Sequence, residues 1–462
     1  MARADEPTAS FSLGSPPGAW PALGHTLALA RDPLAFIASL PAHGDLVRVR
    51  IGPRPLYVAC HPDIVRHILM TPRVFDKGGP LYETGRTVLG NGLATCTWPD
   101  HRRQRPLLQP AFQPARIEQH TATMVRAAQT RTASWTAGAR IDVGRVMTDL
   151  ATHVLGTTLV PLDPADEQRV TDALAATMHT LQLRTMLPFS WWHRLPAPGQ
   201  LRFARAERTL RQVTARVIEN HRTNACQGAG MVSLLLAGQD GSTGQAPSDE
   251  HLRDQIVTMF VGGVESTANT LAFAFHLLGT HPECERRLHA ELDEVLGTRA
   301  PTAADLPRLA YTQRVVTETL RMFPPVWFLT RTITAPTQLA GHPLPAGAAV
   351  AFSPYLLHRR PDLFPDPDEF DPDRWLTEHA KQTGRRSLLP FGAGNRKCIG
   401  DTFALTEIAL ILATIASHWR LRPLPARALK PLKPQVRTVL SYGPSPMTCE
   451  PRRPAPAVEE AS

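Results

Sequence analysis

The chain has 462 residues, 43% of them hydrophobic and 20% charged, and this globular composition excludes a disordered or fibrous protein. The 50 lysines and arginines outnumber the 41 acidic residues, but they are scattered, so nucleic acid is the weaker interpretation of the charge and no nucleic-acid partner is expected. Six cysteines without a CxxC pair argue against a disulfide framework or a structural zinc site.

The N-terminal residues 1–40 predict neither a membrane span nor a signal peptide, because Pro, Gly, His, Arg and Asp interrupt every apolar stretch. We therefore expect a cytoplasmic protein. No internal repeat and no clean linker are visible, so we expect one domain over 1–462, with disordered tails at 1–10 and 451–462.

The periodicity of the chain changes twice. Residues 45–60 alternate apolar and polar side chains, which predicts a β-hairpin or two neighbouring strands. From about 98 to 325 the pattern is mostly helical. The later features are Pro- and Gly-rich breaks at 194–199 and 238–247, strands at 326–333 and 347–353, a Pro/Asp-rich meander at 360–373 and a final apolar helix near 400–418. Together they predict a mainly α protein with a smaller β-rich part.

The segment WPDHRRQR at 98–105 is basic and predicted to be helical. His101 and Arg105 are four residues apart and therefore share one helix face. Taken alone, the segment is consistent with a solvated surface patch or a nucleic-acid contact as well as with a ligand-binding role.

A long apolar helix is predicted at 254–278, and its centre is unusually polar. Glu265, Ser266 and Thr267 follow a glycine pair, and each glycine costs about 1 kcal/mol against alanine in a helix interior. A kinked core helix whose hydroxyls bond back to carbonyls accounts for this pattern about as well as a functional groove does.

Two later motifs carry charge. Glu318 and Arg321 lie one helical turn apart in ETLR, a spacing that is common in surface salt bridges. FDPDRW at 370–375 supplies Arg374. Neither motif is specific by itself.

Residues 391–400 read FGAGNRKCIG, a Gly-rich loop directly before an apolar helix. Helix amides and the positive end of the helix dipole favour a negative sulfur at Cys398, and Gly394 and Gly400 let the backbone approach it closely. An isolated cysteine in such a loop is usually an inert thiol. This decapeptide, however, matches F-x-x-G-x-R-x-C-x-G at every fixed position, and so resembles the haem-binding signature of the cytochrome P450 family.

The resemblance implies the mainly α cytochrome P450 fold, with a small β-rich region, around haem b. Cys398 is then the thiolate ligand of the iron, which pushes electron density toward the O–O bond of dioxygen. Phe391 packs beside that ligand and excludes solvent, and Gly400 directs an amide at the sulfur. The residues implied as partners of the haem propionates are His101, Arg105, Arg331 and Arg396.

The same resemblance gives the helix at 254–278 a role in oxygen activation. Its glycine pair widens a groove for O₂ and water, and its acid–alcohol pair, Glu265 and Ser266, relays protons. Serine stands where threonine is usual in the family, so we assign Thr267 to the relay as well. Glu318, Arg321 and Arg374 correspond to a buried structural triad that locks the segment carrying the cysteine.

The stretches that line substrate in the family are nearly all apolar or aromatic here, which fits a compact hydrocarbon-rich ligand. They fall in 77–95, 178–193, around Met259, and near 326–329 and 439–442. The stretch from PPVWFLTR to FDPDRW looks like bacterial members that oxidise sesquiterpenes. The tentative pocket residues are Leu81, Leu93, Met259, Phe260, Val264, Val326, Trp327, Leu329 and Leu440.

By resemblance, the chain is a monooxygenase that inserts one oxygen atom from O₂ into a hydrophobic small molecule. No reductase-like segment follows, so electrons come from separate proteins of the ferredoxin and ferredoxin reductase type, which would dock near the basic Arg102 and Arg103. A desaturase, an epoxidase or a peroxygenase on the same fold remains an alternative, and a non-catalytic haem protein is a further one.

Overall fold

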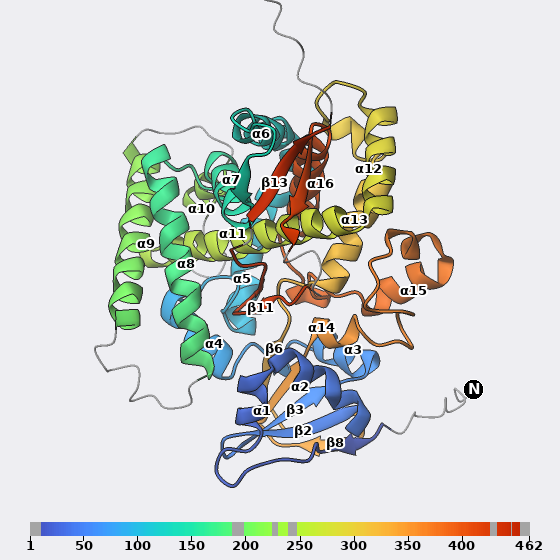
Figure 1. The fold of residues 1–462 in the computed structure, drawn as a ribbon. Coiled ribbons are helices and arrows are strands. Elements are labelled where there is room, and N and C mark those ends of the chain that lie inside the picture. The colour runs from blue at the N-terminus through green and yellow to red at the C-terminus, as the bar shows by residue number, and fades with distance from the viewer. Residues whose placement is uncertain are drawn as a thin grey trace, which may run out of the picture.

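The structure is a computed structural model that describes residues 11–186, 198–223, 230–238, 247–425, 432–444 and 446–452. A helical body forms most of the molecule, and a small sheet region lies at one end of it (Figure 1). The predicted mainly α fold with a minor β part is confirmed. None of the helices in the described ranges is both long and apolar enough to cross a bilayer.

The largest sheet combines the N-terminal hairpin with strands from the second half of the chain. Its strand order is β1-β2-β3-β9-β6-β4, with β3 and β9 parallel. The predicted hairpin is confirmed, because Leu46 pairs with Ala59 and Ile51 with Arg54 in antiparallel register. The strands are β1 Leu13–Gly14, β2 Leu46–Ile51, β3 Arg54–Ala59, β9 Ala349–Phe352, β6 Leu329–Ile333 and β4 Phe75–Asp76.

Three smaller sheets complete the β structure of the described residues. One has the order β10-β13-β5, and two are hairpins, β11-β12 and β7-β8. Pro451 ends β13 and Arg452 donates to Asp293, so the packed chain extends two residues into the expected tail. Residues 1–10 and 453–462 lie outside the described residues. The strands are β5 Arg140–Asp142, β7 Thr337–Leu339, β8 His342–Leu344, β10 Trp419–Pro423, β11 Gln435–Val436, β12 Leu440–Ser441 and β13 Pro446–Pro451.

Five helices place the site: α5 (Trp98–Leu108), α7 (Val143–Thr158), α11 (Asp249–Thr280), α13 (Ala310–Met322) and α16 (Asp401–Ala416). The last begins and ends within two residues of the predicted helix. The others are α1 Thr26–Arg31, α2 Pro33–Ser39, α3 Pro62–Met70, α4 Pro80–Leu89, α6 Pro114–Thr132, α8 Pro164–Met186, α9 Pro198–Thr223, α10 Met231–Ala237, α12 Pro282–Val295, α14 Pro354–Leu357 and α15 Glu378–Ser387. Most of the breaks predicted at 194–199 and 238–247 lie outside the described residues.

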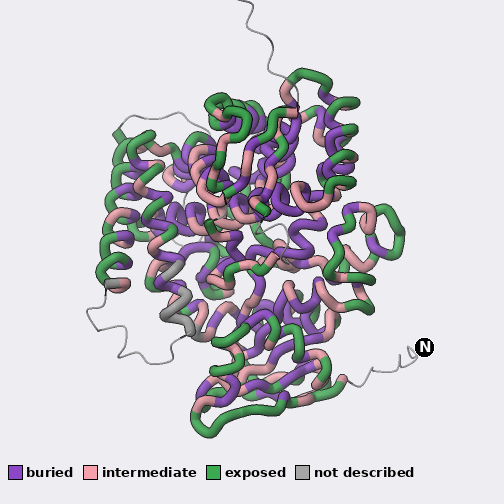
Figure 2. The backbone as a smooth tube through the Cα atoms, in the orientation of Figure 1, coloured by how far each residue is buried: buried purple, intermediate pink, exposed green. Residues whose placement is uncertain are grey.

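Helix α11 crosses the helical body and forms its axis (Figure 1). Ser248 caps its N-terminus by accepting from the His251 amide, and Asp249 and Glu250 in the first turn suit the positive end of the helix dipole. Residues 271–278 of this helix are all buried, whereas the outer faces of α9 and α12 are exposed (Figure 2). A helix held on every side is a rigid support for the polar groups at its centre.

Candidate functional site

The loop that carries Cys398 is shaped by glycine. Gly394 has φ +67°, and a Cβ there would lie 2.6 Å from the carbonyl oxygen of Leu69, so another residue would be strained and would clash. The Cys398 amide donates to the Phe391 carbonyl at 2.9 Å, which turns the chain toward the N-terminus of α16. Gly400 has φ −97°, so its role is close packing on Phe112 rather than unusual backbone geometry.

Cys398 is exposed to the space of a cavity that it lines, while the surrounding protein atoms still desolvate its sulfur. Burial raises the pKa of the thiol, while a hydrogen bond from the Gly400 amide and the nearby Arg105 act to lower it. The amide and the guanidinium therefore favour the thiolate, but they do not overcome the cost of burial. A bound metal cation is the group that would complete its ionisation.

A buried ion cluster links the segment 358–375, which precedes the cysteine loop, to α13. Arg321 donates to both carboxylate oxygens of Glu318, at 2.8 and 2.9 Å, and both side chains are 0% exposed. Arg374 and Trp375 donate to the same carboxylate at 3.3 and 3.0 Å, so the structure brings the three residues of the expected triad together. The remaining guanidinium hydrogens of Arg321 donate to the carbonyls of His358, Pro367 and Glu369, and the cluster is complete.

His358 connects that cluster to the segment before the cysteine. Its Nδ1 donates to the Arg321 carbonyl at 3.1 Å, and its Nε2 accepts from the Leu389 amide at 2.8 Å. Burial and the neighbouring Arg321 lower the pKa of His358 to about 3, so the imidazole is neutral. The carbonyl and the amide together fix a single tautomer.

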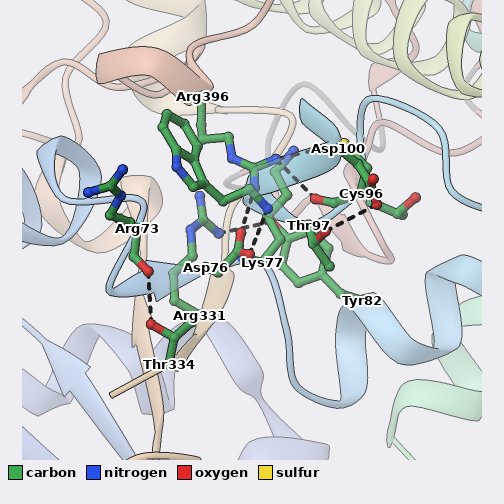
Figure 3. Close-up of polar contacts among 12 residues, drawn as sticks. Arg73, Asp76, Lys77, Tyr82, Cys96, Thr97, Asp100, Arg331, Thr334 and Arg396 are labelled. Atoms are coloured by element: carbon green, nitrogen blue, oxygen red, sulfur yellow. Dashed lines mark hydrogen bonds and ion pairs between the residues drawn. The ribbon is translucent and has the colours of Figure 1, made fainter. Parts of the chain in front are cut away.

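A second cluster of charges lies at one edge of the cavity and is strongly cationic (Figure 3). Arg331 is buried, the side chain of Arg396 is 2% exposed, and Lys77 lies beside them. Asp76 accepts from Arg396 at 2.5 Å, whereas Arg331 Nη1 donates only to neutral oxygens, those of Tyr82 and Thr330. The Nε of Arg396 has no partner among the described residues.

These cations lower one another's proton affinity. Burial, Arg396 and Arg331 lower the pKa of Lys77 to about 7. Burial and the Arg396 guanidinium lower the pKa of His101 to about 3. Arg105 also lines the cavity and donates to the Lys397 carbonyl at 2.5 Å. A buried edge with one carboxylate for several cations is electrostatically incomplete, and it fits a ligand that brings carboxylates of its own.

The opposite wall of the cavity is the polar centre of α11. Gly262, Gly263, Ser266 and Thr267 line it, and the Ser266 hydroxyl donates to the Gly262 carbonyl at 2.6 Å. The Glu265 side chain is not part of the lining, and burial raises its pKa to about 7, against the pull of Arg437. Ser266 and Thr267 therefore lie in the cavity wall, and Glu265 lies next to them in the sequence but outside the wall.

The structure divides the tentative pocket residues into two groups. Leu93, Met259, Val326 and Leu329 line the cavity. The other five lie outside its wall: Leu81 is partly buried, and Phe260, Val264, Trp327 and Leu440 are core residues. Phe391 and Gly400 also line it, beside Cys398. Of the stretch 178–193, residues 187–193 lie outside the described residues.

Sequence reasoning missed several polar residues of the cavity. Lys77 was the first residue of an expected apolar stretch, and Asp76, Tyr82 and Thr258 gave no signal of their own. Glu407 on α16 also lines the cavity, and its Oε1 has no partner among the described residues. Burial raises the pKa of Glu407 to about 8, so this acid is mostly neutral.

The donor set constrains the kind of metal site. No group of three or more His, Cys, Asp or Glu side chains in the described part of the chain is arranged to hold a metal ion. A metal bound to Cys398 alone must therefore bring its remaining ligands with it. A largely apolar cavity that is lined by a thiol, a glycine pair and several cations meets the needs of a metal porphyrin that carries carboxylates.

The comparisons with known proteins agree with this geometry. A family model described as cytochrome P450 matches residues 14–449. Cyclooctat-9-en-7-ol 5-monooxygenase of Streptomyces melanosporofaciens is 47% identical over 96% of this chain and 97% of its own length. Cyclooctatin synthase of the same organism is 47% identical over 94% and 95%, and pentalenene oxygenase of Streptomyces avermitilis is 41% identical over 92% and 94%.

Proposed function

The chain belongs to the cytochrome P450 family, whose members are monooxygenases that bind haem b through a cysteine thiolate, and on that premise we propose that Cys398 is the thiolate ligand and that the substrate is a terpene. The observation that carries the proposal is the position of Cys398, two residues before the N-cap of α16 and open to a largely apolar cavity. Bound haem supplies the activation of dioxygen and the transfer of one oxygen atom to substrate.

The cationic edge of the cavity would hold the haem carboxylates. His101, Arg105, Arg331 and Arg396 are the donors that the sequence indicated, and Lys77 joins them in the structure. Carboxylates placed there would accept the unpaired Nε–H of Arg396 and offset the mutual repulsion of the cations. The protein would thereby fix the orientation of the cofactor.

Glu265, Ser266 and Thr267 would deliver protons at the α11 wall. A carboxyl group whose pKa is about 7 can both release and regain a proton at neutral pH, which suits an acid that works in every cycle. The Ser266 hydroxyl donates to a carbonyl of its own helix and can turn this hydrogen toward an oxygen in the cavity. Thr267 is buried on the next position of the same wall and would share this role.

The substrate would rest against side chains without charge. Leu93, Met259, Val326 and Leu329 offer hydrocarbon surface, so orientation depends on shape more than on polar anchors. Three relatives bear names that refer to oxidation of cyclooctat-9-en-7-ol, to cyclooctatin and to pentalenene, which supports a terpene skeleton here.

Separate redox proteins would supply the electrons, and we propose an acidic ferredoxin as the immediate donor. Arg102 and Arg103 are exposed on α5, and Lys397 is exposed next to Cys398. Arg103 pairs with Asp100 and Lys397 with Asp401, so Arg102 carries the main positive charge offered to a partner. An acidic partner would dock there by charge complementarity and would dissociate at high salt.

The test is the difference spectrum of the reduced protein with and without carbon monoxide. The unmodified protein should show a strongly red-shifted Soret band, and Cys398→Ala should lose it. Cys284→Ala is the control, because that cysteine lies on α12, away from the cavity lining. A red-shifted band that survives in Cys398→Ala would disprove the assignment of the ligand. Terpenes that cause no spectral shift on titration, where fatty acids do, would disprove the substrate class.

A further inference from the structure

The segment between α4 and α5, residues 90–96, forms a wall of the cavity at Leu93 and Ala94. It contains no regular secondary structure. A loop of this kind is usually the mobile part of a fold, because its backbone groups bond to water. Here Leu93, Thr95 and Cys96 are buried, so the backbone groups around them need partners inside the protein.

Two buried glutamines from distant helices supply a continuous chain of hydrogen bonds to this loop. The Leu93 amide donates to Gln255 Oε1 at 3.1 Å, Gln255 Nε2 donates to Gln104 Oε1 at 3.1 Å, and Gln104 Nε2 donates to the Asn91 carbonyl at 2.8 Å. Gln255 lies on α11 and is 0% exposed, and Gln104 lies on α5 and is 5% exposed.

The direction of this chain is fixed by the loop itself. At one end the backbone offers an N–H and at the other a carbonyl, so each glutamine amide has a single orientation that satisfies both neighbours. Aligned hydrogen bonds strengthen one another in a low-dielectric interior, and the removal of one member leaves two buried groups without partners. The chain is therefore cooperative and costly to break.

Further contacts hold the loop against α11 on both sides of the glutamine chain. The Asn91 amide donates to Asp254 Oδ2 at 2.8 Å. Gly90 has φ +53°, and a Cβ at this position would overlap the Asp254 carboxylate. A Cβ at Gly92 would overlap the Thr258 hydroxyl. Backbone and helix are thus in direct contact, which is possible only with glycine at these two positions.

The carbonyls that face the other way bind cations. Lys77 Nζ donates to the Leu93 and Ala94 carbonyls at 3.3 and 2.7 Å, Arg86 to that of Thr95 at 2.9 Å, and Arg396 to that of Cys96 at 3.0 Å. Lys77 and Arg396 also belong to the cationic edge of the cavity. The loop is therefore connected to the expected haem carboxylates on one side and to α11 on the other.

We propose that Gln104 and Gln255 are positioning residues that hold Leu93 and Ala94 as a fixed wall of the substrate cavity, and thereby select which face of a terpene is presented to the haem. The part about substrate rests on the function proposed above. The part about the wall does not, because it depends only on the hydrogen bonds of the resting protein. Neither glutamine lines the cavity, so each acts through the loop and not by touching substrate.

The variants are Gln255→Leu, Gln104→Leu and the double variant, all in the haem-containing protein. Leucine keeps the approximate volume and removes the hydrogen bonds, and Gln255→Glu keeps the acceptor for the Leu93 amide but not the donor to Gln104. Gln129→Leu, on an exposed turn of α6, is the matched control. Haem content and the difference spectrum with carbon monoxide should stay at the control level.

The first measurement is hydrogen exchange of the peptide that spans 90–96. We expect exchange of the Leu93 amide to rise at least about tenfold in Gln255→Leu, since its only partner is lost, and to rise much less in Gln255→Glu. The double variant should match Gln255→Leu, because the Leu93 amide has already lost its partner there and the further loss of Gln104 removes nothing more from this amide. Unchanged exchange in Gln255→Leu, or additive effects in the double variant, would overturn the proposal.

The second measurement separates a positioning role from a merely structural one. Imidazole and 4-phenylimidazole are titrated into the ferric protein, and the dissociation constant of the phenyl compound should change several-fold in Gln255→Leu while that of imidazole stays the same. Equal changes for both probes would overturn the selective wall. With a turned-over terpene, the ratio of regioisomeric products should shift as well. Failure of the red-shifted band would refute the haem-thiolate function, and the exchange result would still decide whether the wall is held.

Discussion

The molecule contains two buried clusters of charged side chains that are built on opposite principles. In the first, the Glu318 carboxylate accepts hydrogen bonds from the side chains of Arg321, Arg374 and Trp375. The remaining guanidinium hydrogens of Arg321 donate to backbone carbonyls. In the second, which holds Lys77, Arg331 and Arg396, Asp76 pairs with Arg396, and the Nε of Arg396 is left without a partner in the described structure. The first cluster makes all of its hydrogen bonds within the protein, whereas the second has fewer negative than positive groups.

This difference separates scaffold from ligand site without reference to any relative. A buried ion pair with all its hydrogen bonds made contributes order but has no capacity to bind anything more. A buried group of cations that is short of anions carries a cost that a ligand can remove, so its free energy is available for binding. The same residue type, arginine, thus serves as scaffold in one cluster and as receptor in the other.

The largest effect is expected where the complete cluster is broken. Glu318→Gln leaves Arg321 fully buried without its counter-ion, and such losses cost about 3–5 kcal/mol. We expect little folded, haem-containing protein, with a lower midpoint in denaturant unfolding and a low haem-to-protein ratio. Glu283→Gln removes an exposed pair with Arg286 and should leave the free energy of unfolding nearly unchanged. Equal effects of the two substitutions would contradict the contrast.

The incomplete cluster should respond in the opposite sense. Arg331→Met removes a cation that has no acid partner of its own, so the cofactor-free protein should become no less stable. Haem retention should fall, because a charge-assisted hydrogen bond to a carboxylate is worth about 1.5–3 kcal/mol, roughly a tenfold to hundredfold faster loss. Transfer of haem to an excess of apomyoglobin measures this rate. Arg126→Met, exposed on α6, is the control, and slower or equal haem loss in Arg331→Met would refute the receptor role.

Glu265 extends the comparison to a buried acid without an ion-paired partner. Its pKa is raised by burial to about 7, so the folded protein holds its proton more tightly than the unfolded chain does. Stability contributed by the protonated acid is therefore lost as the pH rises from about 4.5 through 7. Glu265→Gln should be more stable than the parent at pH 8 and equal to it near pH 4.5, in thermal unfolding.

The same variant should lose proton delivery. We expect turnover to fall about tenfold or more and a larger share of reducing equivalents to appear as hydrogen peroxide. Glu219→Gln, exposed on α9, should alter neither property. A variant with normal turnover at every pH would remove Glu265 from the relay.

The smallest effect expected is the uptake of one proton by Lys77 when haem binds. Burial and, after it, repulsion by Arg396 and Arg331 lower the pKa of Lys77 to about 7 in the cofactor-free protein, so the fold gains stability from this residue as the pH rises above that value. Haem carboxylates would restore its charge, and haem binding should then take up a proton and weaken above pH 7. Lys77→Met should abolish this slope in haem titrations, and Lys381→Met, exposed on α15, should keep it. A slope that persists in Lys77→Met would assign the proton elsewhere.

The parts of the fold and site that follow from contiguous sequence could be predicted. The hairpin at 45–60 has its alternation and its turn in one stretch, and the cysteine loop contains its glycines and its thiol within ten residues. Ion partners such as Glu318 and Arg374 were accessible because two local motifs carry them. In each case, neighbouring residues hold the whole signal.

The parts that depend on where a side chain points could not be predicted. Met259, Gly262, Gly263 and Ser266 follow the helical repeat and face the cavity, whereas Phe260, one position further around the helix, turns into the core. Likewise Val326 lines the cavity, and the next residue, Trp327, donates its indole N–H to the Arg437 carbonyl. Gln104 and Gln255 meet only through the tertiary fold, across 151 residues of sequence.

The neutral imidazole of His358 has a consequence for how the enzyme should fail in acid. Its unprotonated nitrogen is the acceptor for the Leu389 amide, at the start of the stretch that leads to Cys398. A proton on His358 Nε2 would place an N–H opposite the N–H of Leu389, and the two donors would repel each other. The segment 389–398, which carries the sulfur of Cys398, would then lose this link to α13. We therefore expect acid inactivation to begin with the release of residues 389–398 from α13, before the helices unfold.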